Sequence, residues 1–343
     1  MMRFIDWRNG TGMRIHELMS SPLPLLLVTA LFAANASGAD AYQAYPTKSI
    51  RFIVPSAAGS GTDILARTLG QKLGERWGQS VIVDNRDGAG GVIGTELAAR
   101  SAPDGYTLYM GFTGPLAVSP ALYKKLPYDP LKDFAPVSLI DSSPVILVIH
   151  PSVAATSVKE LIALAKARPG SLNFGSAGSG TIGHMSGEMF KTMSRTSMTH
   201  VPYKSVSQAV SDLLGGQLQF MFHVAPAVMP HVKAGKLRAL GVTSHNRWAI
   251  LPDLPSIDEA GLPGYESTVW HGVLVPARTP VQLVNRLHQE IVNNIMKRGD
   301  VRETFAAQWI EPLGSTPDDF AKFLKADIER SRKIVKDAGI GTE

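Results

Sequence analysis

The sequence predicts an α/β protein made of two similar halves, each with a parallel-rich sheet flanked by helices. Short apolar strand segments alternate with helix-length segments over residues 49–110 and again over residues 145–242. In each half a strand runs into a loop of small residues that opens a helix, at residues 50–63 and 172–184. Because ligands of open α/β sheets bind beyond the carboxyl ends of the strands, we expect both loops to face one shared cleft. The alternative is two independent domains with unrelated loops.

In the first half, residues 49–54 form a short buried strand. Leu65, Leu69, Leu73 and Trp77 recur every fourth residue, which predicts a helix over residues 63–77. The following elements are a strand at 81–83, a helix from the glycine-rich stretch 85–91 to about residue 100, and a strand at 106–110. Residues 111–143 contain five prolines, and we expect an irregular crossing segment there.

The second half opens with an aliphatic strand at residues 145–149. Ser157 and Glu160 form a capping box that begins a helix, and Pro169-Gly170 ends it. The next elements are strands at 172–174, 198–201, 218–222 and 238–242, and helices at 181–193, 206–214 and 227–234. The chain then crosses back near residue 268 and adds a strand at 273–275, a helix from Pro280, and a last helix to about Lys336. Thr316 and Pro317 mark the start of that last helix.

The composition is that of an ordinary globular protein, with 343 residues, 44% hydrophobic, 18% charged and a formal net charge of +5. Lysines and arginines are scattered, which argues against a nucleic-acid partner. The absence of cysteine excludes disulfides, thiolate metal sites, cysteine nucleophiles and a lipoprotein anchor.

The N-terminus has the order of a secretory signal: three arginines, an apolar run over residues 23–34, and small residues up to Ala39. The apolar run has about 12 residues, against the roughly 20 that a membrane-spanning helix needs. We therefore predict that residues 1–39 are a cleaved signal peptide and that the mature protein is exported and soluble. Cleavage after Ala36 or Ala39, and a true start at Met13, are left open.

Both loops of small residues predict binding of a small anion. The first turn of a helix has backbone N–H groups without an intrahelical partner at the positive end of the helix dipole. Glycines let these groups approach a ligand, and serine or threonine adds hydroxyls. We expect the two loops to hold a carboxylate from both sides through the following residues: Ser56, Ala58, Gly59, Ser60, Gly61 and Thr62 in the first loop, and Ser176, Ala177, Gly178 and Thr181 in the second.

Several polar residues near these loops have two interpretations. His184, in the first turn of the second helix, either faces the ligand or is held by a neighbouring carbonyl. Asp63 either contacts the ligand or caps its helix, and we favour the cap. For Arg86 we favour an ion pair at a sheet edge or domain interface over a ligand counter-charge. Trp270 and His271 either line the cleft or pack at a hinge.

Other chemistries have weak support. Residues 178–183 match the glycine spacing of a dinucleotide site, but residues 198–201 lack the acid that should follow the next strand. None of the nine histidines belongs to a close-spaced metal motif, and no Gly-x-Ser-x-Gly or Walker sequence occurs. We therefore expect no cofactor, no metal and no enzymatic activity.

Several stretches taken together resemble one known family, the Bug-type extracytoplasmic solute receptors of tripartite tricarboxylate transporters. The resemblance runs from about residue 45 to residue 339 and keeps the motifs in order. They are Ile53-Val54-Pro55 through Thr62-Asp63, Asp84-Asn85-Arg86 with Gly88-Ala89-Gly90-Gly91, Ala102 through Leu108, Pro120 through Tyr128, Asn173 through Gly178 with His184, His200 through Lys204, and Ala234 through Leu240.

The resemblance implies a type II periplasmic binding protein, or Venus flytrap, with a ligand cleft between two domains. Domain 1 would be discontinuous, residues 45–143 plus 269–343, and domain 2 would be residues 144–268. A periplasmic monomer would hold a carboxylate by loop backbone, hydroxyls and bridging waters, without an arginine clamp, and would deliver it to membrane permease subunits. A sensor of the same fold and an exported enzyme on this scaffold are the alternatives.

The sequence departs from the family pattern at three places. Ser56 replaces a usual aromatic residue, Ser60 replaces a glycine, and His223-Val224 replaces a frequent Asp-Asn pair. A missing ring enlarges the pocket, and His223 in place of an aspartate removes a partner for an ammonium group. Our hypothesis is a larger ligand without an amino group, such as a dicarboxylate or an aromatic acid, that His223 contacts.

Overall fold

The computed structural model describes residues 44–340. The chain divides into the segment Met1–Thr47 and the compact unit Lys48–Glu343, which contains both sheets. Across residues 44–340, no helix has the length and apolar character needed to cross a membrane. The signal peptide predicted for residues 1–39 lies outside the described residues.

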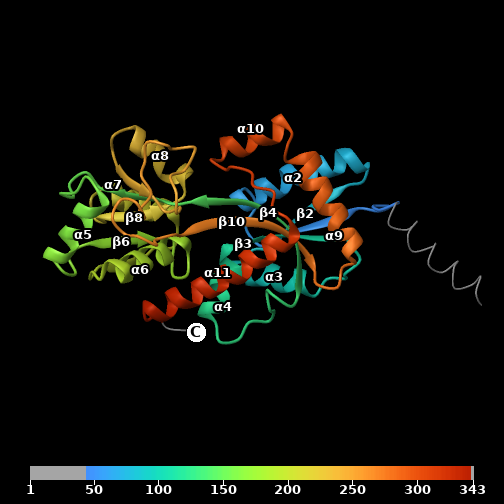
Figure 1. The fold of residues 1–343 in the computed structure, drawn as a ribbon, viewed down its shortest axis with the longest axis horizontal. Helices are drawn as coiled ribbons and strands as arrows, with labels where there is room; N and C mark the ends of the chain where they lie inside the picture. The colour runs from blue at the N-terminus through green and yellow to red at the C-terminus, as the bar shows by residue number, and fades with distance from the viewer. Residues whose placement is uncertain (1–43, 341–343) are drawn as a thin grey trace, which may run out of the picture. The chain divides into compact units, whose positions relative to one another are not determined.

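The first lobe is built on a five-stranded sheet in the order β2-β1-β3-β10-β4 (Figure 1). Strands β1, β2 and β3 are parallel, and β10 runs antiparallel to both β3 and β4. The sheet is therefore parallel-rich with one reversed strand, as the fold prediction required. The strand bounds are β1 Ile50–Val54, β2 Val81–Asn85, β3 Thr107–Phe112, β4 Phe134–Pro144 and β10 Thr268–Pro276.

The second lobe repeats this plan with a five-stranded sheet in the order β7-β6-β8-β5-β9. Strand β6 pairs in parallel with β7 and β8, and β5 runs antiparallel to β8 and β9. All four residues of β5 are buried and aliphatic, because helices cover both faces of the sheet. The bounds are β5 Ile146–Ile149, β6 Asn173–Ser176, β7 Thr199–Pro202, β8 Phe220–His223 and β9 Arg238–Val242.

Helices flank both sheets and close their cores. In the first lobe they are α2 Gly61–Trp77, the 3₁₀ turn η2 Ala89–Gly91, α3 Val92–Ala99, the π-helical turn η3 Gly114–Val118, α4 Ser119–Leu122, α9 Val281–His288, the π-helical segment η4 Gln289–Ile295, α10 Gly299–Ala307 and α11 Pro317–Asp337. In the second lobe they are α5 Val158–Ala167, α6 Ile182–Ser194, α7 Val206–Leu214 and α8 Ala225–Lys233.

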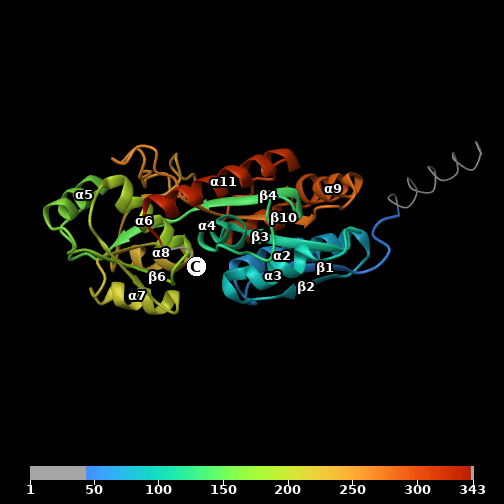
Figure 2. The same ribbon diagram turned by 90° about the horizontal axis from the view of Figure 1, so that it is seen from below.

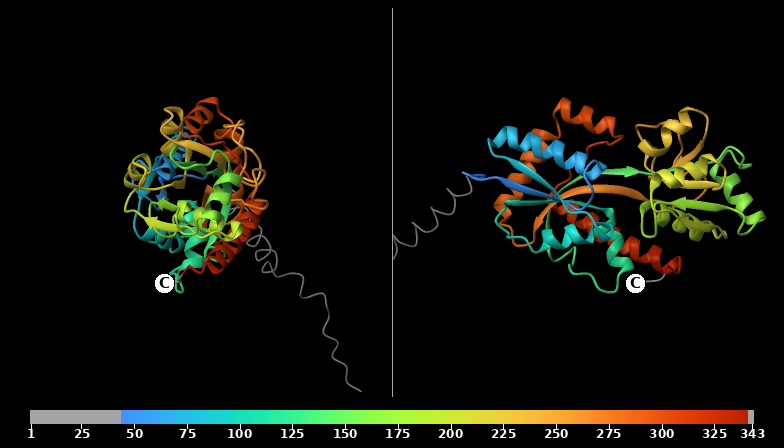
Figure 3. Two further views of the ribbon diagram at one scale, coloured as in Figure 1. Left: turned by 90° about the vertical axis from the view of Figure 1, so that its left-hand side faces the viewer. Right: turned by 180° about the vertical axis from the view of Figure 1, so that it is seen from behind.

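The expected irregular crossing over residues 111–143 is wrong for its second part. Residues 134–144 form β4, an 11-residue strand. Proline has no N–H to donate, but Pro136 is accommodated because β4 lies at the edge of its sheet. Strand β10, also longer than expected, pairs along β4 from Phe134 to Pro144, so the two strands lie side by side between the lobes (Figure 3).

The long helix α11 also links the lobes. It packs along β4 and reaches α6 of the second lobe (Figure 2). Val335 of α11, Met185 of α6 and Val118 of η3 form a small buried cluster there. The helix starts as predicted, because the Thr316 hydroxyl accepts a hydrogen bond from the Asp319 N–H at 3.1 Å.

Candidate functional site

A cavity of about 390 Å³ is lined by residues of both lobes. Loops that follow β1, β2 and β3 in the first lobe, and β6 and β8 in the second, supply most of its wall, where α/β sheets place their ligands. The first lobe contributes Pro55, Ser56, Asp87, Ala89, Gly90, Gly91, Phe112, Thr113, Gly114, Val118, Ser119, Leu122 and Tyr123. The second lobe and β10 contribute Ala177, Ser179, Gly180, Thr181, Ile182, His223 and Val269.

The cavity can suit an anion although none of its described lining residues has a cationic side chain. Among the described residues that line it, none is lysine or arginine, and Asp87 is the one charged residue. Asp87 is exposed, and its carboxylate accepts a hydrogen bond from the Gly88 N–H at 2.8 Å. Attraction of an anion to this cavity would therefore depend on helix starts and hydroxyl groups rather than on an ion pair.

The start of α6 is open to a ligand. Its N-cap residue, Thr181, makes no capping hydrogen bond, because its hydroxyl donates to the Gly178 carbonyl at 2.7 Å. No acidic residue occupies the first turn of α6. The first N–H groups of this helix lack an intrahelical partner and lie beside Thr181 and Ile182, which line the cavity. This arrangement is compatible with an anion site at the second loop, which stays a prediction.

The start of α2 is organised differently, although the sequence suggested an equivalent role. Ser60 caps the helix by accepting from the Asp63 N–H at 3.2 Å. The Asp63 carboxylate accepts from the Gly59 N–H at 2.8 Å and from Arg67 and Asn85. Burial by itself would raise the pKa of Asp63, but these hydrogen bonds hold the pKa below its ordinary value. The structural role that we favoured for Asp63 agrees with these contacts.

The first loop reaches the cavity through Pro55 and Ser56. Gly61 instead lines a neighbouring cavity of about 200 Å³, which shares Val269 with the first cavity. Ala58, Gly59, Ser60 and Thr62 line neither cavity.

Two helix starts that were not predicted as binding loops line the cavity, whereas the start of α2 does not. The turn η2 and the start of α3 bring Gly90 and Gly91 to the cavity, and no side chain caps either element. A Cβ on Gly91 would lie 3.1 Å from both the Pro55 carbonyl oxygen and Pro115, so three loops meet there too closely for a side chain. The stretch 88–91 could have been found by the criterion applied to the other loops, since it is glycine-rich and follows a strand. Thr113 and Gly114, at the start of the turn η3, also line the cavity, and their signal was weaker because Pro115 lies inside the turn.

His223 lies at the end of β8, lines the cavity, and has a Nδ1 atom that is buried without a hydrogen-bond partner. Burial lowers the pKa of His223 to about 4, so the imidazole is neutral at pH 7. A buried polar atom without a partner typically costs about 1–3 kcal/mol. In a cavity, such an atom can form a hydrogen bond with a polar group of a bound molecule.

The remaining predicted residues have other positions. The Nδ1 atom of His184 accepts from the Gly180 N–H at 3.0 Å, and His184 lines a separate cavity of about 400 Å³. The Ser176 side chain is fully buried and bonds to Gly178 and His200. Gly178 lines neither this cavity nor the two described above.

Trp270 does not line any of these cavities. It is fully buried in the first-lobe core, and its indole N–H donates to Asp327 at 2.7 Å. The predicted contact of Trp270 with ligand has no support from this position. His271 pairs with Asp141 at 2.8 Å and lines the neighbouring cavity, and Arg86 pairs with Asp84 at 2.9 Å.

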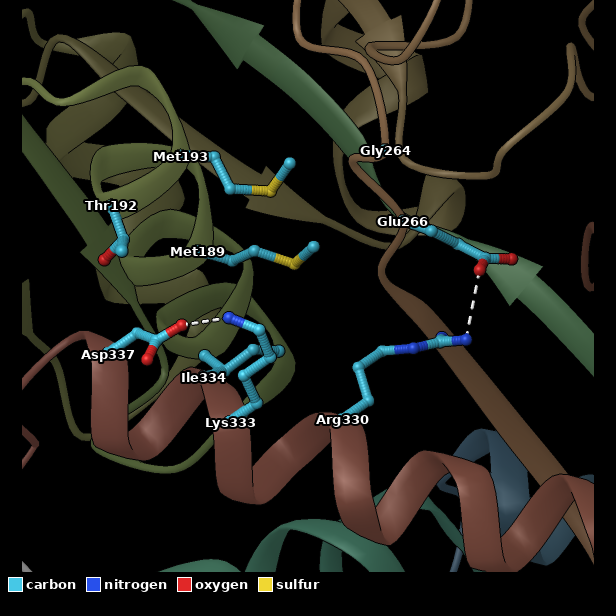
Figure 4. Close-up of a pocket in the computed structure, with 9 residues that line it drawn as sticks. All are labelled: Met189, Thr192, Met193, Gly264, Glu266, Arg330, Lys333, Ile334 and Asp337. Atoms are coloured by element: carbon cyan, nitrogen blue, oxygen red, sulfur yellow. Dashed lines mark hydrogen bonds and ion pairs between the residues drawn. The ribbon is translucent and has the colours of Figure 1, made fainter.

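A further hollow of about 410 Å³ lies between α6, the segment before β10, and α11 (Figure 4). Met189 and Met193 of α6 face it, and Arg330 of α11 pairs there with Glu266 at 3.1 Å. None of the predicted site residues lines this hollow. Over residues 44–340, no group of three histidine, aspartate or glutamate side chains is arranged to hold a metal ion.

Comparison with known proteins identifies relatives of the whole fold. The model of the tripartite tricarboxylate transporter family receptor matches residues 65–340. Protein BugT of Bordetella pertussis is 38% identical over 318 residues, which cover 92% of this chain and 97% of BugT. The structure of Rpa4515 from R. palustris with adipate is 37% identical with a TM-score of 0.76, covering 87% of this chain and all of that one. MatC from Rhodopseudomonas palustris with bound malate is 29% identical with a TM-score of 0.71, covering 85% of this chain and all of MatC. The two-lobed fold is thus that of periplasmic solute-binding proteins, and the chain belongs to the tripartite tricarboxylate transporter receptor family.

Proposed function

We propose that this protein is a periplasmic receptor that binds a small organic carboxylate between its lobes and delivers it to a membrane permease. The observation that carries the proposal is the cavity itself. Open helix starts from both lobes converge on it, and its described lining residues include no lysine or arginine. Family membership supports this function over an exported enzyme.

The two lobes correspond in this proposal to the two domains of a flytrap, residues 45–143 with 269–343 and residues 144–268. The sheets support this division, because one takes its strands from residues 50–144 and 268–276 and the other from residues 146–242. A ligand that contacts both lobes favours the closed arrangement only through contacts that it makes to both at once. The permease would recognise that closed surface.

The ligand class follows from the wall of the cavity. Its volume of about 390 Å³ lies within the range of roughly 300–1,000 Å³ that is usual for small-molecule sites. Apolar side chains also line the cavity, which suits a ligand with an aliphatic or aromatic body; they are Phe112, Val118, Leu122, Ile182 and Val269. We propose a dicarboxylate or aromatic acid, with one carboxylate at the start of α6 and a second polar group hydrogen-bonded to His223. Adipate in a relative of 37% identity supports an aliphatic dicarboxylate.

Thermal-shift screening of the purified mature protein tests the function. The panel contains mono-, di- and tricarboxylates, aromatic acids and amino acids. A ligand at 100 times its Kd stabilises the folded state by about 2.7 kcal/mol, which is a readily measured rise in Tm. We expect at least one dicarboxylate or aromatic acid to raise Tm. A panel in which no acid does so contradicts the proposal.

The absence of an ammonium partner is tested by calorimetry with adipate and 2-aminoadipate. We expect the amino acid to bind more weakly, since neutral His223 offers no negative charge to its ammonium group. Equal affinities would remove the reason for this part of the proposal. The variant His223→Asp provides the matched comparison, because it should shift the preference toward 2-aminoadipate.

A further inference from the structure

Two histidine rings stack beside the second loop, at a cavity that adjoins the ligand cavity. His184 lies in the first turn of α6 and His200 in β7, with ring centroids 4.1 Å apart and ring planes 26° apart. Both line the cavity of about 400 Å³, which shares Leu122, Tyr123, Ser179 and Gly180 with the ligand cavity. The loop of residues 176–181 therefore borders the ligand cavity and the cavity of the histidine pair.

His184 holds the far end of this loop. Its Nδ1 atom accepts the hydrogen bond from the Gly180 N–H at 3.0 Å, so Nδ1 must be unprotonated and the ring proton lies on Nε2. Gly180 has a φ of +77°, in the left-handed region that glycine adopts without strain. The hydrogen bond from Gly180 to His184 favours one of the many backbone conformations that a glycine can adopt. Gly180 immediately precedes Thr181 and the open start of α6.

His200 holds the near end of the loop through Ser176. The His200 Nε2 and Ser176 Oγ atoms are 2.7 Å apart. Ser176 Oγ in turn accepts from the Gly178 N–H at 3.2 Å and donates to the Gly178 carbonyl at 3.0 Å. Either His200 donates to Ser176 through Nε2–H or the Ser176 hydroxyl donates to Nε2, according to the tautomer, and both cases join the ring to Ser176. Each ring thus holds one end of the loop through a hydrogen bond.

We propose that His184 and His200 are positioning residues that hold the loop of residues 176–181 in the geometry that binds the carboxylate, and that protonation of His184 releases the loop. The role in ligand binding rests on the proposed function. A proton on Nδ1 turns the acceptor of the Gly180 N–H into a second donor, so the two N–H groups repel each other. Affinity for the acid should therefore fall as the pH falls.

Burial, more than the charges around the pair, favours the neutral form of both rings. Burial lowers the pKa of His184, with a smaller opposing effect from Glu188 and a lowering effect from Lys191. Burial, His184 and Lys191 lower the pKa of His200 to about 4. Glu188 and Lys191 both lie on α6 and pair at 2.5 Å. The other elements at this cavity contribute Tyr123 and the uncharged residues 338–340.

The variants His184→Asn and His184→Leu separate the hydrogen bond from the volume of the ring. Asparagine places a carbonyl acceptor close to the position of Nδ1, whereas leucine fills the space without an acceptor. In the protein without ligand, we expect amide hydrogen exchange at Gly180, measured by NMR, to be at least tenfold faster in His184→Leu and within threefold of wild type in His184→Asn. Unchanged exchange in His184→Leu, or equally fast exchange in both variants, would overturn the proposal.

His200 has its own matched pair of variants. His200→Gln keeps an N–H donor near the position of Nε2, and His200→Leu removes it. We expect exchange at Gly178 to increase only in His200→Leu. Tm values for all variants identify any that fail to fold. If a leucine variant fails to fold, the asparagine or glutamine variant at the same position still tests the hydrogen bond of that histidine.

Ligand affinity gives the readout that a merely structural role would not change. Calorimetry with adipate between pH 7.5 and pH 5.5 should show a steeper loss of affinity in wild type than in His184→Asn, because protonation of adipate itself is common to both. Parallel pH profiles would refute the role of His184 protonation. If adipate does not bind wild type at pH 7.5 while Gly180 exchange follows the expected order, the proposed ligand is wrong and the loop contacts stand.

Discussion

Gly183→Ala tests whether the start of α6 is the anion site. Gly183 is in the first turn of α6 and has no side chain to separate the helix from β8. A Cβ at this position would lie 2.8 Å from the Phe222 carbonyl oxygen and 3.4 Å from the Cβ of Ser176. The carbonyl belongs to a strand in the middle of the sheet and cannot move aside. The helix start must therefore move away from β8.

The size of the effect follows from these distances. Restoring an ordinary separation of about 3.5 Å between the new Cβ and the carbonyl moves the helix start by ~0.5–1 Å. Hydrogen bonds from N–H to oxygen span only about 2.7–3.2 Å, so a shift of this size breaks or weakens those to the carboxylate. A hydrogen bond to a charged group contributes about 1.5–3 kcal/mol, and losing one should weaken Kd by roughly tenfold to a hundredfold.

Stability should change less than affinity. Alanine is favoured over glycine in a helix by about 1 kcal/mol, which offsets part of an overpacking cost of about 1–3 kcal/mol. We expect the free energy of unfolding, from urea titration, to fall by about 0–2 kcal/mol. Gly299→Ala is the matched control, because Gly299 begins α10 with a non-positive φ and no atom within 4 Å of its added Cβ.

The assay is calorimetry of both variants with the acid that the thermal-shift panel identifies. Gly299→Ala should bind as wild type does. If Gly183→Ala also retains wild-type affinity, the carboxylate does not bind at the start of α6, and the proposed anion site is refuted.

Three further predictions concern parts of the fold outside the ligand contacts. Trp270→Phe removes the hydrogen-bond donor to buried Asp327 and should lower the free energy of unfolding by about 2–4 kcal/mol. The Kd for the acid should not change. A large loss of affinity at wild-type stability would mean that Trp270 contacts the ligand. Thr316→Ala removes the N-cap of α11 and should cost about 1 kcal/mol in urea unfolding, and no loss would show that the cap hydrogen bond to Asp319 is dispensable. Burial lowers the pKa of His200 from 6.5 to about 4, so its neutral form stabilises the fold. This contribution to the free energy of unfolding is complete above pH 6.5 and is lost as the pH falls from 6.5 toward about 4, by ~2 kcal/mol after discounting for partial exposure. An equal loss of stability in His200→Gln over that range would mean that other groups cause it.

Local sequence signals predicted the elements that depend on local chemistry. The Thr316 cap located the last helix, and the four-residue spacing of leucines located α2, because capping and amphipathicity are properties of a few adjacent residues. Strand β4 was missed because its prolines are acceptable only at a sheet edge, and edge position is a property of the whole sheet. Strand β10 was predicted too short for a similar reason, because its partner β4 lies more than a hundred residues away in the chain.

At the site, the sequence identified loops better than individual contacts. Of the residues predicted to bind ligand, Ser56, Ala177, Thr181 and His223 line the cavity, and their contact with a ligand stays a prediction. The glycine pattern does not reveal whether a helix start is already satisfied by its own side chains, and at α2 Ser60 and Asp63 do this. The orientation of an aromatic residue on a strand is equally inaccessible to local reasoning. Trp270 faces the core because Asp327, 57 residues away, receives its N–H.

The paired strands β4 and β10 constrain how the two lobes can move. Sliding one strand past the other would break the ladder of backbone hydrogen bonds that joins them from Phe134 to Pro144. Bending or twisting the ribbon as a unit keeps that ladder intact, so rotation of the lobes costs less free energy than sliding. Capture and release of solute should then proceed by rotation of the lobes, and a crosslink across the cleft mouth should block it.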